Sequence, residues 1–199
     1  MKILLETLSC FLLAATMQNL VLTTGVGTSA MLKIIRRPRQ LIAFSGLLML
    51  FTLATAAVFY PIDQVLPYTS RMARLLRPFI IVAITALLYI GLSLVASRRF
   101  GGWYRRVRHL LPLSAFNSLV VGVVLVFNYQ VQLSFFPAIG LAAGAVVGFL
   151  FVSAITAEGI SRVDNPDTPA AFRGLPAALV YLGLLALALM GFEPVYNLI

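Results

Sequence analysis

The distribution of charge along the chain restricts its fold more than any other feature. Asp, Glu, Lys and Arg are absent from five long stretches, residues 7–32, 40–62, 78–97, 110–157 and 174–192. A membrane-spanning helix needs about 20 apolar residues, so four of these stretches fit one helix each. The stretch 110–157 has 48 residues and therefore fits two helices with a turn near Asn128–Gln132. With 61% hydrophobic and 11% charged residues, the chain does not resemble a soluble domain.

We therefore predict an all-α integral membrane protein with six transmembrane helices. The predicted spans are roughly 3–24, 41–60, 78–97, 110–127, 134–157 and 174–192. Because each half contributes three spans, the second half is expected to be inverted relative to the first. The chain is then a single membrane domain, 1–199, with repeat one at about 1–97 and repeat two at about 110–199.

The basic residues predict how the chain is oriented in the membrane. The connections after spans 1, 3 and 5 hold eleven of the fifteen Lys and Arg residues, and the other side holds Lys2, Arg71, Arg74 and Arg77. The positive-inside rule places the eleven in the cytoplasm and both termini outside, in a bacterial or archaeal cytoplasmic membrane. The net charge of +9 is thereby explained by orientation and by contact with anionic lipids, and we expect no nucleic-acid partner.

Polar residues interrupt span 1 and span 4. The first interruption is TTGVGTSA, residues 23–30, and the second is Ser114–Ser118. Glycine allows unusual backbone angles, and the hydroxyls can bond to backbone groups that a helix break leaves unpaired. Two interpretations stay open: helices broken near the midplane, which would form a site, or continuous helices whose hydroxyls bond back to carbonyls.

Three glycines and one aspartate are also informative. Gly140, Gly144 and Gly148 form a stripe on one face of span 5, which indicates close packing against a helix of this chain or of another subunit. Asp63 ends span 2, where we interpret it as a solvated loop residue rather than an ion-entry carboxylate. No carboxylate is expected within a span, which argues against a self-sufficient ion pump.

No catalytic constellation of a soluble enzyme is visible in the sequence. The single cysteine, Cys10, lies inside span 1 and cannot form an internal disulfide or a metal cage. We find no nucleophile–base pair and no metal cluster. Whether the chain is part of an enzyme stays open; at most we expect a non-catalytic subunit of a membrane oxidoreductase of the translocase type.

Several segments resemble one family of membrane proteins. DTPAAFRG at 167–174 is similar to the DxPxxxRG segment that precedes the last span in the A subunit of Rnf complexes and the E subunit of Nqr complexes. LPLSAFN at 111–117 resembles the family's LPLITTN, and QNLVL at 18–22 resembles its NNFVL-type segment. The resemblance covers almost the whole chain and marks four motif residues: Asp167, Pro169, Arg173 and Gly174.

The resemblance implies a subunit of an ion-translocating electron-transfer complex. Family members pair with a homologous subunit of opposite orientation, beside further redox subunits, and each contributes two cysteines to a shared iron or iron–sulfur centre. This chain departs from that pattern, because Ser118 stands where the family has the cysteine of TNC and Ser29 where it has the cysteine of GLCPF. A serine hydroxyl is a poor substitute for a thiolate ligand of iron.

We therefore expect a divergent Rnf/Nqr-like subunit that is a scaffold without its own complete iron–sulfur centre. No cofactor or metal is expected from this chain alone; a centre ligated mainly by a partner is the other version. The candidate midplane site consists of Asn19, Gly25, Gly27, Ser29, Asn117 and Ser118. The alternative is a component of a small-solute or vitamin-type transporter, in which these residues line a polar substrate site.

Overall fold

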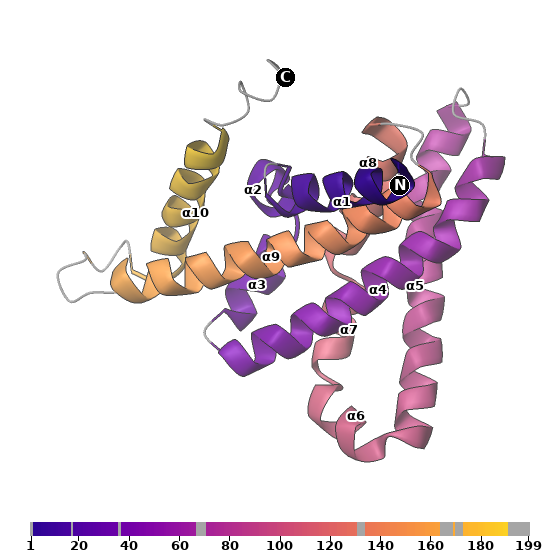
Figure 1. Ribbon diagram of the computed structural model, residues 1–199. Coiled ribbons are helices and arrows are strands. Elements are labelled where there is room, and N and C mark those ends of the chain that lie inside the picture. Colours follow the sequence, from indigo (N-terminus) through magenta and orange to yellow (C-terminus); the bar gives the residue numbers. More distant parts are fainter. Residues whose placement is uncertain are drawn as a thin grey trace.

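The structure is a computed structural model that describes residues 2–16, 18–35, 37–66, 71–130, 134–163, 169 and 173–190. All regular secondary structure in these ranges is α-helix, as predicted (Figure 1). The helices are α1 (Lys2–Ala15), α2 (Leu20–Thr24), α3 (Thr28–Ile34), α4 (Pro38–Val65), α5 (Arg71–Arg99), α6 (Gly101–Val107), α7 (Leu110–Ala115), α8 (Ser118–Gln130), α9 (Phe135–Val163) and α10 (Leu175–Met190).

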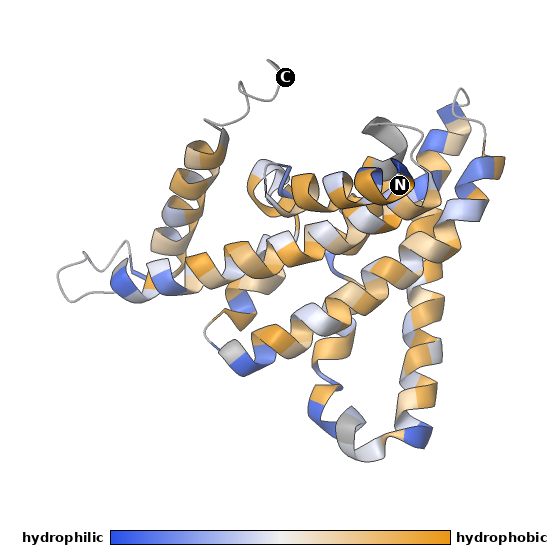
Figure 2. Cartoon of the chain, in the orientation of Figure 1, coloured by the Kyte–Doolittle hydropathy of each residue, from blue (hydrophilic) through white to orange (hydrophobic). Residues whose placement is uncertain are grey.

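Three of the described helices, α4, α5 and α9, are long and apolar enough to cross a membrane. Two shorter apolar stretches lie at 110–126, across α7 and α8, and at 175–189 in α10. Figure 2 shows apolar residues along the middle of the long helices and hydrophilic residues gathered at helix ends and on α6. This arrangement is that of a helical membrane protein, because apolar side chains can face lipid while charges stay near water.

The α4–α5 hairpin corrects one prediction. Asp63 is not a solvated loop residue, because α4 continues to Val65 and Asp63 is only 5% exposed. The Arg77 Nε atom donates to the Asp63 carboxylate at 2.8 Å, and its Nη2 atom donates to the carbonyl of Leu66 at 3.2 Å. Two opposite charges that neutralise each other can be buried, so the helices extend past the residues where charge counting ended the spans.

The glycine stripe of α9 lies against α1. A Cβ atom added to Gly140 would lie 2.6 Å from the carbonyl oxygen of Thr7, and one added to Gly148 would lie 2.9 Å from that of Ala15. Gly144 is in the same way adjacent to the carbonyl of Phe11. Residue numbers rise together along both helices, so α1 and α9 run in the same direction (Figure 1). The close backbone approach depends on the absence of side chains at these glycines.

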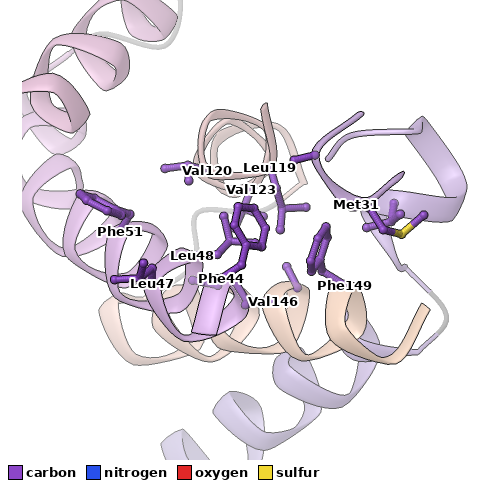
Figure 3. Close-up of a cluster of buried hydrophobic side chains, with 14 of the residues drawn as sticks. Met31, Phe44, Leu47, Leu48, Phe51, Leu119, Val120, Val123, Val146 and Phe149 are labelled. Carbon is purple, nitrogen blue, oxygen red and sulfur yellow. The ribbon is translucent and has the colours of Figure 1, made fainter. Parts of the chain in front are cut away.

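The apolar core lies where α3, α4, α8 and α9 meet, as Figure 3 shows. The rings of Phe44 from α4 and Phe149 from α9 pack at 5.8 Å between centroids, with an interplanar angle of 46°. Met31 from α3 and Val123 from α8 are fully buried beside them. This cluster joins residues from both halves of the sequence and fixes the positions of the two interrupted spans.

Candidate functional site at two helix breaks

The first interrupted span is divided into three helices. α1 ends at Ala15, α2 spans Leu20–Thr24, and α3 begins at Thr28. Gly25 and Gly27 have φ angles of 71° and 88°, which L residues with a side chain rarely adopt. The Thr23 and Thr24 hydroxyls donate to the carbonyls of Asn19 and Leu20. The segment is therefore broken, as the first interpretation predicts, and not a continuous helix, although the threonine hydroxyls do bond back along the short α2.

The second interrupted span breaks between α7 and α8. α7 ends at Ala115 and α8 begins at Ser118, with Asn117 immediately before it. The Ser114 hydroxyl donates to the carbonyl of Leu111 at 3.0 Å. The Asn117 side-chain oxygen accepts from the backbone N–H of Leu119 at 2.9 Å, which caps the new helix.

The two breaks contact each other although 91 residues separate them. The backbone N–H of Gly27 donates to the Ser118 hydroxyl oxygen at 3.0 Å. We call the contact between residues 25–27 and residues 117–118 the break junction. A Cβ atom on Gly27 would lie 3.4 Å from the Phe149 ring and 3.5 Å from the Asn117 side-chain oxygen, so the loop packs directly on α9 and on the cap of α8. The junction thus unites candidate residues from the two halves of the sequence.

The two breaks are capped in the same way. Asn19 accepts from the N–H of Val21 at 3.1 Å, just as Asn117 accepts from the N–H of Leu119. Both asparagines are almost completely buried, at 2% and 4% exposure. A Cβ atom on Gly148 would lie 2.7 Å from the Asn19 side-chain nitrogen, so the glycine stripe also makes room for this cap. Packing of α9 and the geometry of the first break are therefore coupled.

Several other residues at the two breaks are exposed at the surface of the isolated chain. Ser29 and Ser118, the two serines at family cysteine positions, are both exposed, as are Thr23, Thr24 and Gly25. Ser29 lies in the first turn of α3, and Ser118 is the first residue of α8. The site therefore combines buried asparagine caps with an exposed polar edge.

One buried donor at the junction has no hydrogen-bond partner. The Asn117 side-chain nitrogen is inaccessible and unpaired in the described part of the structure. An unpaired buried donor costs about 1–3 kcal/mol, so this asparagine is retained at some expense to stability.

The family motif near the C-terminus lies apart in the sequence from these breaks. Asp167 falls outside the described residues, while Pro169 and Arg173 are exposed. Gly174 has a φ angle of 79° and its carbonyl accepts from the N–H of Ala178, so it begins α10. In this structure the glycine of the motif sets the start of the last helix.

Sequence reasoning missed three residues that shape the site. Gly122 of α8 lies beside Val26 of the first break, where an added Cβ atom would come within 3.1 Å of the valine side chain. Phe149 covers Gly27 from α9. Gly122 follows Asn117 by five residues, and Gly25 follows Asn19 by six. This rough similarity could have drawn attention to Gly122, whereas no sequence pattern indicates that Phe149 covers Gly27.

Comparisons with protein families and with known proteins show which proteins this chain is similar to. The model of the Rnf-Nqr family, described as a membrane protein subunit, matches residues 7–196. The chain belongs to the Rnf-Nqr family of membrane subunits. It is 29% identical over 179 residues to the A subunit of the ion-translocating oxidoreductase complex of Syntrophotalea carbinolica, covering 90% of this chain and 92% of that protein.

Two further relatives carry related names. The A subunit of the same kind of complex in Colwellia psychrerythraea is 31% identical over 140 residues, which covers 70% of this chain and 67% of that protein. The A subunit of the Na(+)-translocating ferredoxin:NAD(+) oxidoreductase complex of Acetobacterium woodii is 27% identical over 181 residues, or 90% of this chain and 93% of that protein. These Rnf-Nqr relatives match along most of the chain.

The two serines at family cysteine positions do not fit the iron centre that the family resemblance implies. Iron–sulfur clusters are held by cysteine thiolates, whereas this chain offers the hydroxyls of Ser29 and Ser118. The Ser118 oxygen already accepts a hydrogen bond from Gly27. Among the described residues there is no group of three or more His, Cys, Asp and Glu residues that could hold a metal ion. The residues at the junction are therefore suited to hydrogen bonding rather than to iron.

Proposed function

We propose that this chain is an integral membrane subunit of an Rnf-type, ion-translocating electron-transfer complex, in which it acts as a scaffold without its own complete iron–sulfur centre. The observation that carries the proposal is the break junction. It contains Ser118, which by the resemblance stands at one of the family's two cysteine positions, and the Ser118 hydroxyl accepts a hydrogen bond from the backbone of Gly27. Membership of the Rnf-Nqr family and relatives named as the A subunit of such complexes support the assignment to the complex.

We further propose six membrane spans arranged as two inverted three-helix repeats in a prokaryotic cytoplasmic membrane, with both termini outside. Two observations support this arrangement. The first and fourth proposed spans are both broken, and an asparagine caps each break in the same geometry. In addition, α1 and α9 run in the same direction, as the first and fifth of six alternating spans would. Arginines on the predicted cytoplasmic side would contact anionic lipid headgroups.

The proposed partner is a homologous membrane subunit of opposite orientation, together with the redox subunits of the complex. Irregular backbone is not stable when exposed to lipid at membrane depth; it requires cover from protein or an aqueous cavity. Thr23, Thr24 and Gly25 at the first break are exposed in the isolated chain. A partner that covers the break junction supplies that protection.

Metal analysis and electron paramagnetic resonance test the scaffold role. The complex is purified from native membranes with either wild-type chain or the variants Ser29→Ala, Ser118→Ala and Cys10→Ser. We expect the iron content and the spectrum of the complex to be unchanged in all three variants, because none of these side chains binds iron. Loss of an iron signal in Ser118→Ala, with the complex still assembled, would show that the serine is a ligand.

Cross-linking tests the partner. A cysteine introduced at the exposed Ser29 should cross-link to another subunit in native membranes. The matched control is a cysteine at the exposed Ser97, at the far end of α5, which should give less cross-linked product. If Ser29→Cys gives no more cross-linked product than Ser97→Cys in an assembled complex, no partner covers the exposed edge of the first break, next to the break junction.

A further inference from the structure

A groove between α9 and α10 is not used by any part of the proposed function. It has a volume of about 500 Å³ and is lined by Phe151, Ile155, Glu158 and Arg162 from α9 and by Tyr181 from α10. Pockets of roughly 300–1,000 Å³ are typical of small-ligand sites. The Tyr181 ring packs directly over Gly159, where a side chain would collide with it, so α10 is held against α9 at this level. The groove therefore has a defined wall on each side.

One end of the groove carries both signs of charge. Arg162 donates from Nε and Nη2 to the same Glu158 carboxylate oxygen, Oε1, at 3.1 and 3.0 Å. In the described part of the chain this leaves the second carboxylate oxygen and the other terminal guanidinium nitrogen unpaired. Both side chains are largely exposed, at 67% and 77%. The pair thus presents an acceptor and a donor side by side at the mouth of the groove.

The other end of the groove is apolar. Phe151 is 55% exposed, and it lies two turns before Glu158 on the same face of α9. A helix face that passes from aromatic and aliphatic residues to an acid–base pair matches a molecule with a hydrocarbon chain and a headgroup of both charges. In a membrane protein, such a ligand reaches the groove directly from the bilayer.

We propose that the α9–α10 groove binds a zwitterionic phospholipid with a primary amine, of the phosphatidylethanolamine type. The acyl chain lies along Phe151 and Ile155, the phosphate accepts hydrogen bonds from Arg162, and the ammonium donates to Glu158. A choline headgroup has no N–H to donate to the carboxylate, and a glycerol headgroup has no positive charge to meet it. The charge pair therefore selects the amine headgroup over both.

Native mass spectrometry of the full-length chain tests this assignment. The protein is purified in detergent micelles doped with equimolar phosphatidylethanolamine, phosphatidylcholine and phosphatidylglycerol, and the retained lipids are counted. Basic residues elsewhere on the chain also attract phosphatidylglycerol, so the informative comparison is between the two zwitterionic lipids. Wild type should retain phosphatidylethanolamine over phosphatidylcholine by roughly two- to fivefold, the size expected for one exposed ion pair. Glu158→Gln should lose the preference over phosphatidylcholine, and Arg162→Gln should reduce retention of all three lipids.

Three further variants serve as controls. Glu6→Gln and Arg98→Gln remove the same charge types at exposed positions outside the groove and should leave the lipid preference unchanged. Ala154 also lines the groove, so Ala154→Trp fills the groove without altering a charge and should abolish the preference for phosphatidylethanolamine over phosphatidylcholine. Equal retention of phosphatidylethanolamine and phosphatidylcholine by wild type, or unchanged selectivity between them in Glu158→Gln, would each overturn the proposal.

Discussion

Substitution of Gly140 by alanine tests the packing of α1 on α9. The added Cβ atom would lie 2.6 Å from the carbonyl oxygen of Thr7, whereas ordinary contact begins at 3.4 Å. The two helices must therefore separate locally by about 0.8 Å, the difference between these distances. Overpacking of this kind costs about 1–3 kcal/mol. Alanine in place of glycine also stabilises a helix interior by roughly 0.5–1 kcal/mol, which offsets part of the overpacking cost.

Gly46→Ala isolates the packing cost. Gly46 lies within α4, and an added Cβ atom there has no neighbour within 4 Å. Both variants gain the same helix propensity, so the difference between them measures overpacking alone, about 1–3 kcal/mol in favour of Gly46→Ala. The midpoint of unfolding by sodium dodecyl sulfate in mixed micelles, followed by far-ultraviolet circular dichroism, provides the comparison. Equal midpoints would refute close packing of the stripe on α1.

Two further substitutions test buried polar contacts by the same unfolding measurement. Arg77→Met should lower the free energy of unfolding by about 3–5 kcal/mol because it removes the guanidinium that donates to the buried Asp63 carboxylate at 2.8 Å. The double variant Asp63→Leu/Arg77→Met should recover most of that loss, and equal loss in both variants would mean that packing volume dominates. Ser118→Ala should lower the free energy of unfolding by about 1 kcal/mol because it removes the acceptor for the Gly27 N–H. Ser29→Ala, at an exposed position, should change the free energy of unfolding by no more than about 0.5 kcal/mol. Similar effects of the two serine variants would contradict the importance of the junction hydrogen bond.

The helical parts of the fold could be predicted because long stretches without charged residues indicate membrane-spanning helices. The cores of α4, α5 and α9 coincide with three predicted spans. Their ends could not be placed, since charge counting treats every ionised residue as a boundary. Asp63 and Arg77 neutralise each other inside the hairpin, and their pairing depends on how the two helices fold back, which no local pattern reveals.

The candidate site was only partly predictable for a similar reason. Glycines and hydroxyls at 23–30 and 114–118 indicated where the helices could break, because local backbone preferences reside in those residues. The contact between Gly27 and Ser118 depends instead on how both halves pack around Phe149. The glycine stripe likewise predicted a packed face but left its partner open, and the structure places α1 there.

The pairing of α1 with α9 has a consequence for synthesis of the chain. Phe11 and Gly144 are separated by about 130 residues, so α1 enters the membrane long before its neighbour exists. At about 5–20 residues per second, the ribosome needs on the order of ten seconds to supply α9. During that interval the face of α1 that carries Thr7 and Phe11 is available to the insertion machinery or to early partners. Ribosome-stalled chains ending before residue 135 should cross-link through that face, and chains long enough for all of α9 to have left the ribosome should not.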